Sequence, residues 1–452
     1  MNIKRKIAIA AVPAVMALAS TSVDSKILLM SQEGWEVSFD GAANAFIMKN
    51  STSNVPDSSG GTGNIAFDTY GGVTGLNSHD DTSIVTGLLP NVWGMTLKAP
   101  TANGLDVSAR LGLYTHMNGG ENSLGNGQIN IRETSGSVAG SFGTVLVGRS
   151  LGIHQSNAIL NDMLLFGVGG AASASNNGTT LGRIGLGYLY TDFSPQISWT
   201  LPGMDALGGN FGAKVGIFDP SDIGADTAAF SATDKHAPRV EAQITYTGGI
   251  GDLGINLWVD GTYQNTERTE AEAAARTQHD NVATGGVGNV NQNDNRDTDV
   301  DSAGVGFGTK LTYQGFSVVA SGFYASALGI RGQHSVGSLT NGVTTAANAT
   351  GALDDVGTKR NSYGGYLQGT YDFGQGTSAG YSYGGNCLHR TGNDIQTRGV
   401  MNCQTMHSGM IWHNVTDNFR LIAEGGYTEK TWYLADSDQE DSFGGVGAFF
   451  FW

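Results

Sequence analysis

Apolar and polar residues alternate with a period of two along most of the chain after residue 33. Trp35, Val37 and Phe39 share one side of a segment whose intervening residues are polar, and residues 105–114 and 128–132 repeat the pattern. Such alternation is typical of β-strands that have one apolar and one polar face. The pattern therefore predicts an all-β protein.

The predicted strands are joined alternately by short turns and by long polar loops. The short turns are predicted at residues 100–103, 139–142, 203–209, 248–252, 314–315, 374–376 and 416–418. The long loops are predicted at residues 50–81, 150–180, 219–237, 265–300, 329–359 and 388–402, with shorter ones at 117–126 and 434–440. Tight turns on one side and long loops on the other are typical of transmembrane antiparallel β-barrels. Counting residues 181–201 as one long strand gives about 16 strands.

No internal segment approaches the roughly 20 consecutive apolar residues that a membrane-spanning helix needs. A membrane-spanning structure must then be a closed barrel, because lipid cannot satisfy unpaired backbone groups. The chain ends in Phe449-Phe450-Phe451-Trp452, which is predicted to close the last strand against the first and to place Trp452 at a membrane interface.

Other aromatic residues are predicted to complete two girdles at the membrane interfaces. They are Tyr188, Tyr190, Trp199, Trp258, Tyr263, Tyr313, Tyr371, Trp412, Tyr427 and Trp432.

The first nineteen residues are interpreted as a secretory signal peptide. Lys4, Arg5 and Lys6 are basic, residues 7–19 are mostly apolar, and Ala17-Leu18-Ala19 fits a cleavage site. The expected organisation is a signal peptide at residues 1–19 and one barrel domain at residues 20–452.

The charge balance is acidic, with a formal net charge of −16, which disfavours nucleic acid as a partner and favours cations near the surface. The two cysteines, Cys387 and Cys403, are predicted to form a disulfide because an exported chain meets an oxidising environment. Two free thiols are the alternative.

Three parts of the sequence resemble the Gram-negative outer-membrane porin family. They are the opening strand GWEVSFDGAANAF, the segment GSFGTVLVGRSLGIHQSNAILNDMLLFGVGG and the terminal aromatic residue. The resemblance implies a homotrimer of sixteen-stranded barrels with an inward-folded third loop at residues 150–180. It also implies that Trp452 and Phe450 belong to the signal read by the barrel-assembly machinery. The chain departs from the family by ending in Trp instead of Phe.

The resemblance places Asp162 in the third loop, where it would face basic residues of the wall across a pore constriction. Arg110 and Arg132 lie at polar positions of their strands and are predicted to point inward. Arg149 shares the parity of residues predicted to face lipid, so it is a candidate only because its strand ends there. Polar neighbours of Asp162 and two further basic candidates complete the predicted set: His154, Gln155, Asn157, Asn161, Arg183 and Arg420.

Carboxylates on one side of a constriction and guanidinium groups on the other would create a transverse electric field that disfavours apolar solutes. The alternative is that the arginines pair with nearby carboxylates such as Asp40 or Asp106 and serve stability.

The predicted function is a water-filled channel across the outer-membrane bilayer for passive diffusion of small hydrophilic solutes and ions. Two alternatives stay open: an oligosaccharide-specific porin, for which Tyr114 is the one candidate inward aromatic residue, and a structural or adhesive barrel without an open pore. An enzyme is not expected, because Ser408 and His407 are adjacent on a strand and face opposite sides.

No cofactor is expected, and no metal site is assigned. Four acidic residues, Asp294, Asp297, Asp299 and Asp301, fall in one predicted loop. They lack the spacing and the glycine of a calcium-binding EF-hand loop, so a solvated acidic loop is the preferred interpretation.

Overall fold

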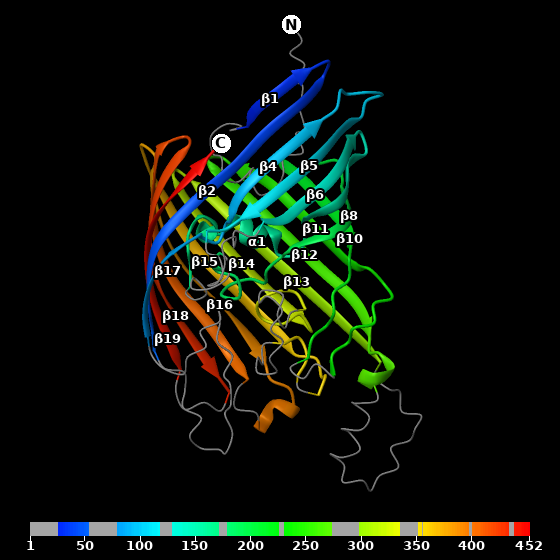
Figure 1. The fold of residues 1–452 in the computed structure, drawn as a ribbon, viewed down its shortest axis with the longest axis vertical. Helices are drawn as coiled ribbons and strands as arrows, with labels where there is room; N and C mark the ends of the chain where they lie inside the picture. The colour runs from blue at the N-terminus through cyan, green and yellow to red at the C-terminus, as the bar shows by residue number, and fades with distance from the viewer. Residues whose placement is uncertain are drawn as a thin grey trace.

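The chain forms an antiparallel β-barrel whose last strand pairs with its first long strand (Figure 1). The structure, a computed structural model, describes residues 26–53, 79–117, 129–170, 179–225, 230–273, 298–334, 351–354, 356–396, 400–433 and 438–452. The predicted signal peptide lies outside these residues.

The barrel strands have the following bounds: β2 (Trp35–Thr52), β3 (His79–Val85), β4 (Asn91–Lys98), β5 (Asp106–Thr115), β6 (Ile129–Gly140), β7 (Gly143–Leu151), β8 (Phe193–Thr200), β9 (Met204–Ala206), β10 (Gly209–Phe218), β11 (Arg239–Ile250), β12 (Leu253–Glu267), β13 (Asp299–Tyr313), β14 (Phe316–Ser326), β15 (Asn361–Gly374), β16 (Thr377–His389), β17 (Met401–Thr416), β18 (Phe419–Trp432) and β19 (Gln439–Phe451). Strands β3 and β4 pair with the two halves of β2, and β8 and β9 pair with the two halves of β10. The barrel therefore has sixteen strand positions, as predicted.

Closure is made by the chain terminus, as the sequence predicts. β19 runs antiparallel to β2, with Ala448 opposite Ala45. The backbone N–H of Gly41 donates to the carbonyl of Trp452 at 2.9 Å, and Trp452 N–H donates back at 3.1 Å. A strand the sequence did not predict, β1 (Ile27–Gln32), forms a hairpin with the start of β2.

The two faces of the sheet differ in polarity. On β12, Leu257, Val259 and Tyr263 are 45%, 54% and 51% exposed on the outer face, whereas Asp260 and Gln264 on the inner face are 2% and 1% exposed. An apolar exterior around a polar interior is what a barrel in lipid requires. Within the described ranges, no helix has the length and apolar character to cross a membrane.

A turn is found within each predicted short-turn range, and these turns lie at one end of the barrel, near the C-terminus (Figure 1). Within the range 203–209 the turn is only Leu207-Gly208, because residues 204–206 form β9. The turns Gln314-Gly315 and Gln375-Gly376 have positive φ at both residues, 45° and 86° in the first and 53° and 79° in the second. Turns of this kind match the twist of the flanking strands, and glycine at the second position adopts the required φ without strain.

One predicted strand is wrong in extent. Residues 181–201 were expected to form a single strand, but β8 begins only at Phe193. Gly182 and Gly185 have φ of 55° and 76°, which extended strands do not adopt, and they redirect the chain before residue 193.

The aromatic girdles are confirmed only in part. Trp199, Tyr263 and Tyr313 are 42–51% exposed on the outer face, as predicted. Four residues predicted to lie in the girdles are buried or nearly buried instead: Tyr188, Tyr190, Trp258 and Trp432. The burial of Trp258 follows from strand parity, because Trp258 lies between the exposed Leu257 and Val259 and therefore points to the other face.

The cysteine prediction is confirmed. Cys387 of β16 and Cys403 of β17 are directly opposite each other across the two strands, with 4.1 Å between their Cα atoms, and they form a disulfide. The bond fastens the strand ends that flank residues 388–402.

Candidate functional site

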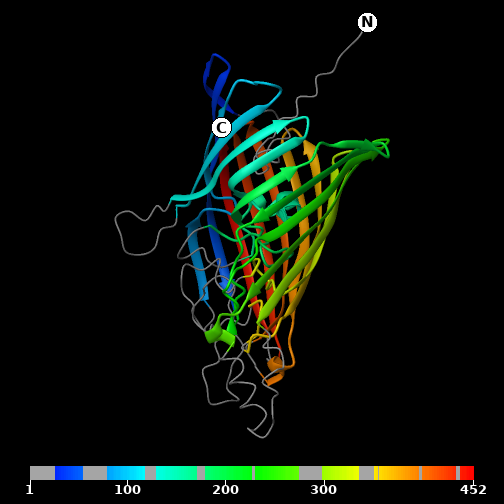
Figure 2. The same cartoon turned by 90° about the vertical axis from the view of Figure 1, so that its right-hand side faces the viewer.

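The interior of the barrel contains the described residues of the chain between β7 and β8, residues 152–170 and 179–192, here called the inner segment. It includes α1 (Ser156–Asn161) and a short 3-10 helix, η1 (Met163–Phe166). Leu164, Val168 and Tyr188 have no exposed surface. Figures 1 and 2 show α1 within the ring of strands, and the inner segment shares one apolar cluster with wall residues such as Phe46 and Met406.

Wall carboxylates hold the start of the inner segment through its backbone. Glu241 of β11 accepts hydrogen bonds from Ile153 N–H at 2.6 Å and from His154 N–H at 2.9 Å. Oδ1 of Asp260 on β12 accepts a hydrogen bond from Gln155 N–H at 2.9 Å. The same oxygen lies 2.6 Å from His154 Nδ1. These charge-assisted bonds are stronger than neutral ones and fix where the segment enters the lumen.

A third wall carboxylate holds the segment from the other side of the barrel. Glu424 of β18 accepts hydrogen bonds from Val168 N–H at 2.7 Å, from Gly169 N–H at 2.9 Å and from the Ser408 hydroxyl at 3.1 Å. Because β11 and β18 are seven strand positions apart, the segment crosses the lumen between them.

Neutral side chains of β15 also hold the inner segment. Tyr366 donates its hydroxyl to Ala158 O at 2.8 Å, while Gln368 accepts from Met163 N–H at 2.7 Å and donates to Asn161 O at 3.2 Å. All of these wall residues lie on the polar, inward face of their strands. The alternation of polar and apolar residues in the sequence does not reveal that a loop packs against this face.

Asp162 is buried within the inner segment and pairs with Arg183 of the same segment. The shortest separation between their charged atoms is 3.7 Å, and neither side chain is exposed. Asp162 also accepts from Tyr188 Oη at 2.9 Å and from Leu164 N–H at 3.1 Å. Burial raises the pKa of Asp162, and the Arg183 charge opposes that rise. These contacts lie within the inner segment, and Asp162 also lines a cavity to which Lys310 and Arg420 of the wall contribute.

Arg110 points inward, as its parity predicts, but it is paired. Its guanidinium lies 2.5 and 2.9 Å from the two oxygens of Asp40 and 3.3 Å from Glu133. Pairing with Asp40 was the alternative considered from the sequence.

Arg132 and Arg149 both lie near Tyr190 of the inner segment. The Arg132 guanidinium donates to Tyr190 Oη at 3.3 Å and lies 5.2 Å from the Tyr114 ring centroid. Burial raises the pKa of Tyr190, while the charges of Arg132 and Arg149 oppose the rise. Gly148, with φ of 131°, lies just before Arg149, whose charge acts on the buried Tyr190 although its position was predicted to face lipid.

A cavity of about 510 Å³ lies between α1, η1 and the turn ends of the wall strands. Lys310 of β13 and Arg420 of β18 line it, together with Asp252 and Asp372 at the turns. Arg420 donates to Asn414 Oδ1 at 2.7 Å, and its guanidinium lies 5.1 Å from the Phe166 ring centroid. Lys310 was not identified from the sequence, although it shares the inward parity of its strand.

The predicted acidic loop is largely outside the described residues, which include neither Asp294 nor Asp297. Asp301 lies on β13 and accepts from Tyr263 Oη at 2.8 Å and from Asn265 Nδ2 at 2.9 Å. Across the described part of the chain, no three His, Cys, Asp or Glu side chains are grouped so as to hold a metal ion.

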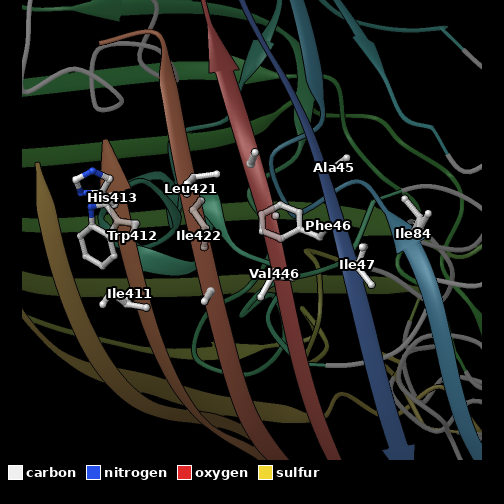
Figure 3. Close-up of a pocket in the computed structure, with 13 residues that line it drawn as sticks. Ala45, Phe46, Ile47, Ile84, Ile411, Trp412, His413, Leu421, Ile422 and Val446 are labelled. Carbon is white, nitrogen blue, oxygen red and sulfur yellow. The ribbon is translucent and has the colours of Figure 1, made fainter. Parts of the chain in front are cut away.

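An apolar depression of about 590 Å³ lies on the outer face over β17, β18, β19, β2 and β3 (Figure 3). Small residues such as Ala45, Ala423 and Ala448 alternate there with exposed bulky residues, among them Ile47 and Val446. The depression spans the strands that close the barrel.

No family model matches the sequence, and no curated protein matches it. Solved structures of outer-membrane channels share its fold. The outer membrane channel DcaP of Acinetobacter baumannii is 14% identical with a TM-score of 0.59, over 94% of this chain and 99% of that chain. The anion-selective porin from Comamonas acidovorans is 14% identical with a TM-score of 0.54, over 92% of this chain and 100% of that chain.

The chain is thus an outer-membrane-type β-barrel of sixteen strand positions. More particularly, it has the fold of outer-membrane porins, so the resemblance seen in the sequence is confirmed at the level of the fold.

Proposed function

We propose that the chain forms a water-filled channel for passive diffusion of small hydrophilic solutes and ions across the outer membrane. The observation that carries the proposal is the polar-walled lumen crossed by an inner segment attached to β11, β12, β15 and β18. A segment held in this way narrows the lumen and sets the size of what passes.

Reconstitution in a planar lipid bilayer tests the proposal. Folded protein should produce discrete conductance steps in potassium chloride. Folded protein that carries no current would contradict the channel and favour the structural or adhesive barrel. Saturation of the current by an added oligosaccharide would instead favour the substrate-specific porin.

We further propose that the chain assembles as a homotrimer through the apolar depression. Replacing Ala448 or Ala423 by Trp would fill the depression and should convert the oligomer to a smaller species in detergent, measured by light scattering. Ala242 of β11 is the matched control, because it lies on the outer face at the opposite side of the barrel and its replacement by Trp should leave the mass unchanged. A monomeric wild type would contradict the proposal.

We also propose that Trp452 and Phe450 form the assembly signal. The Trp452 ring lies 4.8 Å from Trp93 and 5.9 Å from Phe39, and Phe450 stacks on Phe419 at 4.9 Å, measured between ring centroids. Trp452→Ala should lower the amount of folded protein in the outer membrane several-fold, while Trp452→Phe should retain it. Phe316→Ala, an exposed aromatic residue at the same barrel end, is the control. Equal loss in refolding of the purified Trp452→Ala chain would indicate lost stability and not a lost signal.

A further inference from the structure

The lumen contains basic residues that have no acidic partner. Among the described residues, Arg132, Lys214, Lys310 and Arg420 lie on the inward face and Arg149 lies near the buried Tyr190, and none of the five makes an ion pair. Lys214 of β10 alternates with the exposed Val215 and lies near Glu241, but that carboxylate already has Arg239 at 3.0 Å.

The carboxylates of the inner wall, in contrast, are engaged. Asp40 and Glu133 bind Arg110, Glu241 binds Arg239, and Asp441 binds Lys430 at 3.0 Å. These three basic groups compensate three of the four carboxylate charges, because Asp40 and Glu133 share Arg110.

Two wall carboxylates lack a guanidinium or ammonium partner, and the inner segment covers both. Glu424 is 6% exposed under the N–H groups of Val168 and Gly169, and Asp260 is 2% exposed beside His154 and under the N–H of Gln155. Backbone N–H groups oppose a carboxylate's charge, and burial keeps mobile cations from reaching it. By covering these groups, the segment leaves the basic residues as the charges that face the lumen.

Resting on the proposed function, we infer that the channel prefers small anions to cations, although the whole chain carries a net charge of −16. Lys310 and Arg420 line the 510 Å³ cavity through which a solute would leave the inner segment on the turn side. Arg132 and Arg149 flank the same segment at Tyr190. Three carboxylates line the same cavity and oppose this preference. Asp162 is paired with Arg183, and Asp252 and Asp372 sit at exposed turns where water and salt screen them.

The test is the reversal potential of the reconstituted channel across a gradient of potassium chloride. It is recorded below about 0.1 M salt, where the screening length is ~10 Å or more. The wild type should be more permeable to chloride than to potassium. The triple variant Lys214→Gln, Lys310→Gln and Arg420→Gln should lower the chloride-to-potassium permeability ratio by roughly two- to tenfold, since three unit charges leave a narrow lumen.

Lys49→Gln is the control, because it removes one positive charge from an exposed position of β2 on the outer face. It should leave the ratio unchanged. If the triple variant does not fold, Lys310→Gln alone should shift the ratio in the same direction by a smaller factor. A cation-preferring wild type, or equal ratios in wild type and variants, would overturn the inference while leaving the channel intact. Folded protein without conductance would instead contradict the proposed channel function, and the inferred anion preference would then not apply.

Discussion

Replacing residues 153–191 by an Asn-Gly turn is expected to raise the single-channel conductance by about two- to fivefold, because a sixteen-stranded barrel without an inner segment leaves a wide aqueous lumen. The replacement is sterically simple. Leu151 and Phe193 are directly paired across β7 and β8, and Gly152 N–H donates to Asp192 O at 2.9 Å. A two-residue turn therefore continues an existing hairpin.

The same replacement should change which ions pass. Asp260 and Glu424 would lose the N–H groups that now cover them, and their charges would face the lumen. The channel should then become both wider and less favourable to anions, as measured by conductance and reversal potential on the same preparation. A rise in conductance without a change in ion preference would show that the covered carboxylates do not oppose the basic residues.

A matched control is the loop between β10 and β11. Phe218 and Arg239 are also directly paired, so residues 220–237 can be replaced by a turn in the same way. This control should leave the conductance within about twofold of the wild type, because the described part of the loop is held by Glu267 of β12 and by Leu353 and not by the inner segment. Unchanged conductance after removal of the inner segment would place the narrowest point elsewhere.

The fold could be predicted from the sequence because lipid imposes a strict pattern on a barrel. Alternation such as that of residues 257–264 on β12 fixes which side chains face outward, and the turns fix the strand order. The error at residues 181–201 has a physical cause: alternation of Ile184, Leu186 and Tyr188 also suits a segment packed in the lumen. Nearby glycines with positive φ distinguish a strand from a segment packed in the lumen, and their φ cannot be inferred from the sequence.

The interior charges were harder to predict, because parity says which way a side chain points but not what it meets. Arg110 and Arg132 share an inward orientation, yet one is neutralised by Asp40 and Glu133 and the other lies against Tyr190. These contacts join residues up to seventy positions apart in the sequence. Lys214 and Lys310 were overlooked for a related reason, since nothing local distinguishes an unpaired lysine from a paired one.

Replacing Arg183 alone by Met is expected to destabilise the folded chain more than replacing Arg183 and Asp162 together. Neither side chain of this pair is exposed, so the single variant leaves a buried carboxylate without its partner. Such a change costs about 3–5 kcal/mol, whereas neutralising both members is often close to neutral. Asn is the suitable second substitution, because its side-chain oxygen can still accept from Leu164 N–H.

The free energy of unfolding in urea, measured in lipid vesicles for the wild type, Arg183→Met, Asp162→Asn and the double variant, gives the coupling between the two residues. Additive losses would contradict a coupled pair. The same series in the bilayer should show noisier current for Arg183→Met, because Arg183 also donates to Leu186 O at 3.1 Å and to Ser382 of β16.

The pH dependence separates this explanation from a simple loss of packing. Burial raises the pKa of Asp162 in the folded chain above its value in the unfolded chain. At a pH between these two pKa values, the folded chain therefore binds more protons at Asp162 than the unfolded chain does. Stability from this group therefore increases as the pH falls through the folded pKa and levels off below the unfolded one. Arg183→Met removes the charge that opposes the rise, so its stability should recover on acidification from a higher pH than in the wild type. The double variant has no carboxyl group at position 162 and should lack this recovery. If Arg183→Met is equally unstable at every pH, its defect comes from lost packing and not from the buried charge.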